Sequence, residues 1–283
     1  MTASVLFQFD GVSCRYPDGT SGVTDCSLTI ERGSRTVVMG VNGAGKTTFL
    51  QLLNGILRPC CGMIRFNGQP VDYSRAGLYR LRAQVGLLFQ NPDSQLLSAS
   101  VEEDVSFGPI NLGYDTAVVR SSVAAALQTV GMTDCADRPV QALSYGQKKR
   151  IGIAGLLAMQ PEVLVLDEPM AGLDQPMQTG LELLLDTLQR QGMTIVIATH
   201  DSDFAYRWSD RMLLFAEGRC RRQLQTDHLA GSLPLLNELG LGAPSVLSLY
   251  HALLEQQLIP QPATPPRTVA DLIRQVAANP RSV

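Results

Sequence analysis

The sequence of 283 residues is poor in charged and aromatic side chains, which make up 17% and 6% of it. Its formal net charge of −3 argues against a protein that lives on nucleic-acid phosphates, because such proteins carry basic surfaces. No apolar run approaches the roughly 20 residues that a helix needs to cross a bilayer. The first ten residues have no basic residue ahead of their apolar stretch, so they do not read as a secretory signal. We therefore expect a cytosolic protein, which can still dock on a membrane protein.

Patterns typical of metal sites and disulfides are also missing from the sequence. None of the six cysteines belongs to a C-x-x-C pair or stands near a histidine at zinc-ligand spacing. The three histidines are too scattered to suggest a local metal site. We interpret the cysteines as buried or incidental thiols. They are Cys14, Cys26, Cys60, Cys61, Cys135 and Cys220.

Apolar strands and helices alternate along residues 1–225. Residues 1–38 read as short strands, and the apolar runs VLVLDEP and TIVIATH read as later, fully buried ones. Neither run alternates polar with apolar residues, as is typical of a parallel sheet covered on both faces. The stretch LELLLDTLQRQG between them reads as a helix, and residues from about 90 to 160 are mostly helical. This order predicts one α/β domain over residues 1–225 with a helical insertion.

Residues 226–283 change character and predict a small helical extension. Residues 234–257 read as helical, and 259–267 as a proline-rich linker. Thr268 and Asp271 have the spacing of a capping box at the start of a last helix. Its apolar face would hold Val269, Leu272, Ile273 and Val276. Such a short helix is unstable alone, so we expect this face to dock on another surface.

Residues 40–48, GVNGAGKTT, match the phosphate-loop pattern G-x-x-x-x-G-K-[ST] between an apolar strand and a helix. Glycines let the backbone wrap closely around phosphates, and the helix that follows adds positive potential. Lys46 is expected to reach the β- and γ-phosphates, and the Thr47 hydroxyl to hold Mg²⁺. The pattern predicts a nucleoside triphosphate site without naming the reaction. The expected ATP contacts are Asn42, Gly43, Ala44, Gly45, Lys46, Thr47 and Thr48.

A second group of polar residues follows the buried strands. Asp167 ends one strand and Glu168 comes next, and adjacent residues at a strand end point in different directions. Asp167 can therefore serve Mg²⁺ while Glu168 acts as general base for water, although a simple charged strand terminus is the alternative. His200 stands at the edge where ligands bind in open α/β sheets, which favours a catalytic or γ-phosphate-sensing role. Gln90 also follows an apolar run and could reach Mg²⁺ or position water.

Residues 143–147, LSYGQ, form what we call the signature segment. Ser144 precedes a helical pattern and is a good N-cap, so a capped surface helix is one interpretation. Nothing near this helix N-terminus in the sequence suggests a ligand. The order of all these motifs, with AGLD after VLVLDEP, supplies another interpretation. Over roughly residues 4–225, the chain resembles the nucleotide-binding subunit of ATP-binding cassette transporters.

That resemblance implies an ATPase of the phosphate-loop class with a mixed sheet, and it assigns further roles. Tyr16 would stack on adenine, although a core tyrosine is the alternative. Ser144, Gly146 and Gln147 would close over ATP held by a second subunit, with Asp174 at the dimer seam. The family usually has glycine where this chain has Tyr145, which leaves the role of this tyrosine open.

Residues 89–109 and TPPRTVADLI also resemble the energy-coupling-factor and cobalt-uptake ATPases of bacteria. That branch implies a transmembrane coupling subunit, a substrate-binding membrane subunit, and a C-terminal segment that helps to hold the ATPase dimer together. Leu96 and Leu97 would then form part of the floor of a groove for the coupling subunit, unless they are simply core. Residues 143–150, LSYGQKKR, resemble the cobalt-transport members more than the vitamin-transport ones, so cobalt is the expected cargo, with nickel or a vitamin as alternatives. A homodimer suffices, although a paralogous partner is possible.

Rival interpretations belong to other classes of protein. One is a soluble ATP-binding cassette protein that acts on ribosomes or DNA, and the other is a phosphate-loop kinase. The chain lacks the second cassette that is usual in the ribosome-acting class and the long coiled-coil insertion of the DNA-acting class. A kinase has no need of a signature segment.

Overall fold

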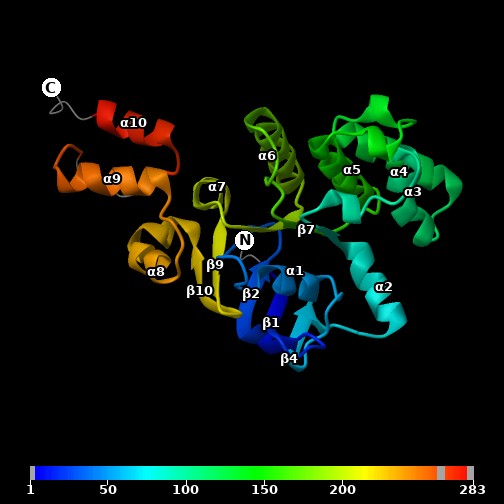
Figure 1. Ribbon diagram of the computed structural model, residues 1–283, viewed down its shortest axis with the longest axis horizontal. Helices are drawn as coiled ribbons and strands as arrows, with labels where there is room; N and C mark the ends of the chain where they lie inside the picture. The colour runs from blue at the N-terminus through cyan, green and yellow to red at the C-terminus, as the bar shows by residue number, and fades with distance from the viewer. Residues whose placement is uncertain (1–3, 260–264, 279–283) are drawn as a thin grey trace.

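The computed structural model describes residues 4–259 and 265–278, and two β-sheets lie in these ranges (Figure 1). One is a six-stranded mixed sheet with the strand order β10-β9-β3-β8-β7-β6, in which only β10 runs antiparallel to its neighbour. The other is an antiparallel sheet with the order β2-β1-β4-β5. The strands are β1 (Val5–Arg15), β2 (Ser21–Glu31), β3 (Arg35–Met39), β4 (Cys61–Phe66), β5 (Gln69–Pro70), β6 (Val85–Leu88), β7 (Val163–Asp167), β8 (Thr194–Thr199), β9 (Arg211–Ala216) and β10 (Arg219–Gln225).

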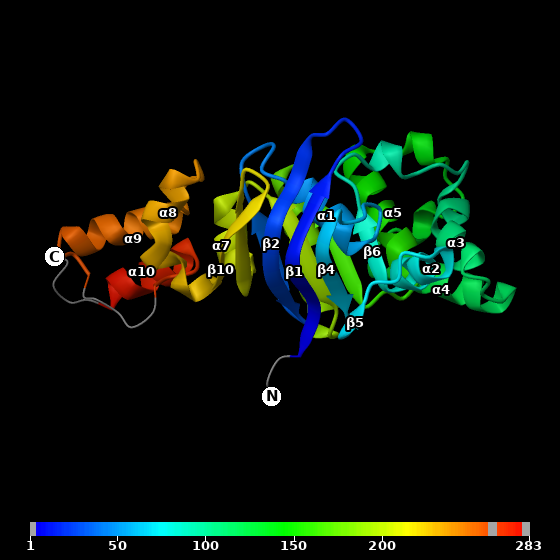
Figure 2. The ribbon, with the colours of Figure 1, turned by 90° about the horizontal axis from the view of Figure 1, so that it is seen from below.

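The α-helices are grouped around the sheets, with α3–α5 and α8–α10 on opposite sides in both views (Figure 1, Figure 2). They are α1 (Lys46–Leu53), α2 (Arg75–Gln84), α3 (Val101–Asn111), α4 (Thr116–Thr129), α5 (Tyr145–Leu157), α6 (Gln175–Arg190), α7 (Ser202–Trp208), α8 (Leu233–Glu238), α9 (Ser245–Glu255) and α10 (Val269–Ala277). Short 3₁₀ helices span Pro92–Ser94, Thr133–Cys135, Val140–Ala142 and Thr226–Ser232. The predicted α/β fold with a mixed sheet and a helical group is confirmed.

The strand β7 is buried on both faces. Successive side chains of a strand point to opposite faces of its sheet, and here each set packs in a different hydrophobic cluster. Leu164 and Leu166 pack in a hydrophobic cluster shared with helices α4 to α7. Val163 and Val165 pack in a second cluster, which contains the apolar side chains of α1 and of the four-stranded sheet. The expectation of a buried parallel strand without polar alternation is therefore confirmed.

Three parallel strands end at the same edge of the six-stranded sheet. Met39 at the end of β3 pairs with Thr199 at the end of β8, and Asp167 at the end of β7 pairs with Ala198. The segments that follow β3, β7 and β8 therefore start side by side. This register brings the phosphate loop, Glu168 and His200 together.

The helix α5 begins at Tyr145, two residues earlier than the apolar pattern alone predicts. Ser144 caps it: its hydroxyl accepts a hydrogen bond from the Gln147 amide at 3.3 Å, and the Gln147 side chain accepts one from the Ser144 amide at 3.0 Å. This reciprocal pair is a capping box, which satisfies two amide groups that have no partner inside the helix. The predicted N-cap is confirmed.

The C-terminal extension differs from the expected single helical stretch. Two helices, α8 and α9, form most of residues 234–257, and the break between them is a feature that the prediction did not include. Gly240 adopts a left-handed φ of 68° just after α8, and Pro244 stands at the N-cap of α9. Apolar periodicity continues across this break because both helices face the same hydrophobic cluster. Residues 260–264 of the expected linker lie outside the described ranges.

The helix α10 begins with the predicted capping box between Thr268 and Asp271, which is confirmed. Only half of its apolar face docks within the chain. Leu272 is buried and Val276 packs against the cluster, whereas Val269 and Ile273 remain 55% and 61% exposed.

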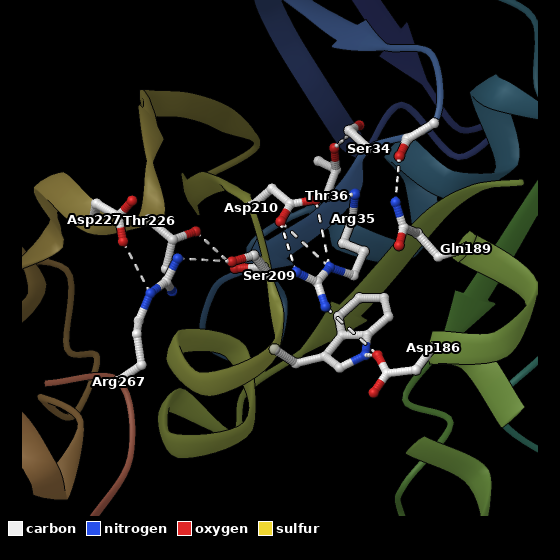
Figure 3. A network of polar contacts seen from close by, with 12 residues as sticks. Ser34, Arg35, Thr36, Asp186, Gln189, Ser209, Asp210, Thr226, Asp227 and Arg267 are labelled. Carbon is white, nitrogen blue, oxygen red and sulfur yellow. Dashed lines mark hydrogen bonds and ion pairs between the residues drawn. The ribbon is translucent and has the colours of Figure 1, made fainter. Parts of the chain in front are cut away.

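Arg267, just before α10, fastens this segment to the rest of the chain (Figure 3). Its guanidinium donates hydrogen bonds to Asp227 at 3.0 Å, to the Ser209 carbonyl at 3.2 Å and to the Tyr206 carbonyl. The extension is therefore anchored at the end of α7. Within the described ranges, no helix combines the length and apolar character needed to span a membrane.

Candidate active site

The phosphate loop, residues 40–48, needs glycine at the position before α1. Gly45 has a left-handed φ of 97°, and a Cβ there would lie 2.5 Å from the Gly22 carbonyl oxygen. Gly43 also has a positive φ of 80°, and nothing lies within 4 Å of the place where its Cβ would be. The loop is therefore tightly bent at Gly45 and open beside Gly43, a shape that can receive a phosphate group at the N-terminus of α1.

Lys46 is the first residue of α1, and its ammonium group folds back over the phosphate loop. The side chain is 7% exposed, and Nζ donates hydrogen bonds to the carbonyls of Gly40 at 2.6 Å and Val41 at 3.3 Å. Burial lowers the pKa of Lys46, while the carboxylates of Glu168 and Asp167 oppose that change. A buried ammonium group that is held by carbonyls is well placed to attract an anion.

Thr47 and Asp167 meet across the site, although they are far apart in the sequence. The Thr47 hydroxyl donates a hydrogen bond of 2.7 Å to Oδ2 of Asp167. Burial raises the pKa of Asp167, and the hydrogen bond from Thr47 lowers it. A hydroxyl and a carboxylate in contact at the mouth of a phosphate loop form an oxygen donor set that suits Mg²⁺.

Glu168 is held by two neighbours at the end of β8. Its Oε1 lies 2.8 Å from Nδ1 of His200, and its Oε2 accepts a hydrogen bond of 3.1 Å from the Thr199 hydroxyl. The Glu168 side chain is 11% exposed and that of His200 is 66% exposed. The pair therefore places a buried carboxylate beside an accessible imidazole, an arrangement that can take a proton from a water molecule.

Tyr16 contacts the end of the phosphate loop. Its hydroxyl forms a hydrogen bond of 2.8 Å with Thr48, and its ring lies 3.0 Å from the place of a Cβ on Gly22. The structure thus puts Tyr16 beside the phosphate loop.

Gln90 follows β6, and its side chain is exposed. Its carbonyl accepts a hydrogen bond of 3.1 Å from the hydroxyl of Tyr145 in the signature segment. The tyrosine therefore ties the start of α5 to the segment after β6.

The remaining predicted residues lie apart from the phosphate loop. In the part of the chain that the structure describes, no hydrogen bond or ion pair joins the signature segment to residues 40–48. Asp174 is exposed and caps α6, where its Oδ1 accepts from the Met177 amide at 2.9 Å. Figure 1 shows the corresponding separation, because α5 lies with α3 and α4 rather than with α1.

Two residues at the site were missed by sequence reasoning. Thr199 holds Glu168, and its position directly before His200 at a strand end was a usable signal. Lys149 donates to three carbonyls in the turn that begins with Glu168. No local pattern marks Lys149, because its partners lie on a different element.

An apolar cavity of about 620 Å³ lies between α2, β6, α3 and α5, near Gln90. Leu96 and Leu97 both line it, the first 9% and the second 79% exposed, so only Leu96 also belongs to the core. Phe107 on its rim is 61% exposed. Exposed apolar side chains grouped on one surface mark an interaction site.

Comparisons with known proteins agree with this geometry. A protein-family model described as "ABC transporter" matches residues 23–171. A "Putative ABC transporter ATP-binding protein" of Methanosarcina mazei is 40% identical over 269 residues, which span 95% of this chain and 59% of that protein. An "Energy-coupling factor transporter ATP-binding protein EcfA3" of Clostridium perfringens is 40% identical over 253 residues, covering 89% of this chain and 88% of its own length.

Among solved structures, cbiO1 from Clostridium perfringens superposes on this chain with a TM-score of 0.75 at 40% sequence identity. The match covers 87% of this chain and 99% of that one. That protein is described as part of the ABC transporter complex cbiONQ.

Proposed function

Because this chain belongs to the ABC transporter family and is an ATPase that couples hydrolysis to transport, we propose that it powers micronutrient import in an energy-coupling-factor-type membrane complex. One observation carries the proposal most directly. Five polar residues lie together at one sheet edge: Lys46, Thr47, Asp167, Glu168 and His200. Short hydrogen bonds join Thr47 to Asp167 and His200 to Glu168, and the two carboxylates act on the charge of Lys46.

The proposed reaction is attack of water on the γ-phosphorus of ATP. Glu168 takes a proton from the water as the new P–O bond forms, and the bond to the bridging oxygen breaks to leave ADP. His200 and Thr199 hold the Glu168 carboxylate in place during this step, and the Lys46 ammonium offsets charge on the phosphates.

Thr47, Asp167 and Gln90 are the residues that we propose to hold Mg²⁺, which would neutralise phosphate charge when bound. The contact between the Thr47 hydroxyl and the Asp167 carboxylate supports this assignment. Tyr16 would stack on adenine. The phosphate-loop contacts would come from Asn42, Gly43, Ala44, Gly45, Lys46, Thr47 and Thr48.

We propose that the signature segment serves the ATP of a second subunit, in a homodimer or with a paralogous ATPase. Ser144, Gly146, Gln147 and Asp174 would then face the partner's nucleotide. The start of α5 supports this role, since Ser144 and Tyr145 are exposed and the first turn has no acidic residue. A helix N-terminus of this kind attracts phosphate through its free amides and its dipole.

The apolar cavity beside Gln90 is the proposed docking site for a helix of the transmembrane coupling subunit. Leu97 and Phe107 would be covered by that helix. The exposed Val269 and Ile273 of α10 would meet the second ATPase subunit. The chain would thus sit on the cytoplasmic face of the cell membrane, as a peripheral subunit beside a substrate-binding membrane subunit.

The cargo that we propose first is cobalt ion, with nickel and a vitamin as the alternatives. The test is to purify the chain with its membrane partners and to measure uptake of each cargo into vesicles that contain ATP. Cobalt uptake that disappears with Glu168→Gln would support the proposal. Purification without any membrane protein, together with ATPase activity alone, would favour a soluble cassette ATPase instead.

A further inference from the structure

Lys149 on α5 is a buried lysine with an unusual set of partners. It is 1% exposed, and Nζ donates to the carbonyls of Glu168 at 3.0 Å, Pro169 at 2.8 Å and Ala171 at 2.7 Å. An ammonium group has three hydrogen-bond donors, so this carbonyl cage uses all of them. Among the residues that the structure describes, Lys149 has no ion-pair partner.

A buried charge of this kind is retained only where its surroundings compensate for lost water. Burial lowers the pKa of Lys149 to about 8, and the carboxylate of Glu168 acts in the opposite direction. The three carbonyl dipoles point at the ammonium and favour its charged form. The geometry therefore keeps a cation at the centre of the turn that follows β7.

The turn around Lys149 has a strained start. Glu168 adopts a left-handed φ of 46°, which side chains with a Cβ rarely do. Its side chain is held by Thr199 and His200 on one side, and its carbonyl by Lys149 on the other. Both ends of the residue are thus anchored by different elements.

Tyr145, one helical turn before Lys149, covers this cage. Its ring centroid lies 5.2 Å from the Lys149 ammonium, and a Cβ on Gly172 would lie 2.9 Å from the ring. Its hydroxyl reaches the Gln90 carbonyl. A glycine at position 145 would leave the cage open to water and would lose the contact with Gln90, which explains what the tyrosine does here.

We propose that Lys149 is a positioning residue for hydrolysis, because it fixes the backbone of residues 168–171 and so aims the Glu168 carboxylate at water. The inference rests on the proposed function of Glu168. The helix α5 would also link the two sites of the dimer, since its start faces the partner's ATP while its Lys149 holds the base for the chain's own ATP.

The first test is steady-state ATP hydrolysis by the full-length chain with Lys149→Met. We expect kcat to fall about 100-fold, as for a base displaced by about 1 Å, with the KM for ATP changed less than about twofold. Lys149→Gln should be intermediate, because an amide can still donate to two carbonyls. The matched control is Lys148→Met, the neighbouring lysine of α5. It removes an ion pair with Asp93 of the 3₁₀ helix Pro92–Ser94 and should change kcat less than about twofold.

Two results would overturn the positioning role. One is a kcat for Lys149→Met close to that of the unchanged chain, and the other is a parallel loss of kcat and ATP affinity, which indicates general damage. If the unchanged chain itself fails to hydrolyse ATP, the proposed function is wrong instead.

A second test uses mixed dimers in which one chain carries Lys46→Ala, so that only the other chain has a competent phosphate loop. Lys149→Met is then placed on either chain. We expect loss of hydrolysis only when it lies on the chain with the intact phosphate loop, since that chain supplies Glu168. If hydrolysis is lost only when Lys149→Met lies on the chain with Lys46→Ala, or equally for both placements, Lys149 acts through the signature segment or through folding.

Discussion

The buried carboxylate of Asp167 affects the stability of the nucleotide-free fold through its protonation state. Its hydrogen bond from Thr47 only partly offsets burial, and the pKa of Asp167 is raised. A carboxyl group with a raised folded-state pKa favours folding when it is protonated, so its contribution falls as the pH rises through that pKa. Ionised Asp167 therefore destabilises the nucleotide-free fold near neutral pH.

Replacing Asp167 by Asn is therefore expected to raise the melting temperature of the nucleotide-free chain at pH 7 while abolishing Mg²⁺-dependent hydrolysis. The stability difference between the two proteins should shrink as the pH falls below the ordinary aspartate pKa of about 3.9, since both are then neutral at this position. Thermal melts of both proteins in EDTA across this pH range measure the difference in stability. A variant that is less stable at pH 7 would contradict the expectation.

Glu168→Gln is expected to keep ATP affinity and to lower turnover at least about 100-fold, because a general base contributes about 10²–10⁴-fold. The amide oxygen can still accept a hydrogen bond from Thr199, so the turn should remain folded. Phosphate release and equilibrium ATP binding are the measurements. Glu102→Gln, exposed on α3, is the control for a neutralised carboxylate and should retain full turnover. Near-normal turnover of Glu168→Gln would remove it as the base.

At the scale of elements, polar contacts around α7 add to the apolar packing that holds the C-terminal extension to the cassette. Ser245, at the start of α9, donates to Asp203 from its amide at 2.6 Å and from its hydroxyl at 2.8 Å. Arg267 brings a positive charge to the carbonyl end of α7, where the helix dipole favours it. Because α7 starts two residues after His200, the extension and the active site share one short helix.

Arg267→Ala should loosen α10 without unfolding the cassette. We expect the free energy of unfolding to fall by about 1–3 kcal/mol, because hydrogen bonds from a charged donor are lost at partly buried carbonyls. Amide hydrogen exchange of residues 269–277 should become faster. Arg274→Ala removes only an exposed contact with Asp271 three residues away and should have little effect on either measurement. Equal effects from both variants would argue against the anchoring role.

At the scale of the whole molecule, the signature segment lies apart from the phosphate loop of its own chain. A shared site predicts complementation between damaged subunits. A dimer with Lys46→Ala on one chain and Ser144→Arg on the other keeps one intact site, because both changes fall on the same nucleotide. A dimer with both changes on one chain and an unchanged partner damages both sites.

We therefore expect the first arrangement to hydrolyse ATP at up to about half of the unchanged rate and the second to be nearly inactive. Two affinity tags allow each mixed dimer to be purified before phosphate release is measured. Sites contained within single chains would reverse this order, because only the second arrangement would then have an undamaged chain.

The sequence by itself determined the parts of the site whose geometry is local. Residues 40–48 form the bend before α1 because Gly43 and Gly45 accept positive φ angles there. Asp167 and His200 could be placed at one edge because parallel strands end together. The capping box at Thr268 followed from two residues three apart, and the N-cap role of Ser144 from its place before a helical pattern.

Only the tertiary structure decided contacts between elements. The ring of carbonyls around Lys149 exists because α5 packs beside the turn after β7, and no spacing along the chain encodes that approach. The same holds for the hydrogen bond from Tyr145 to Gln90 across 55 residues. Apolar periodicity predicted the face of α10 but not that Val269 and Ile273 stay exposed, because burial depends on what another segment or another subunit places over them.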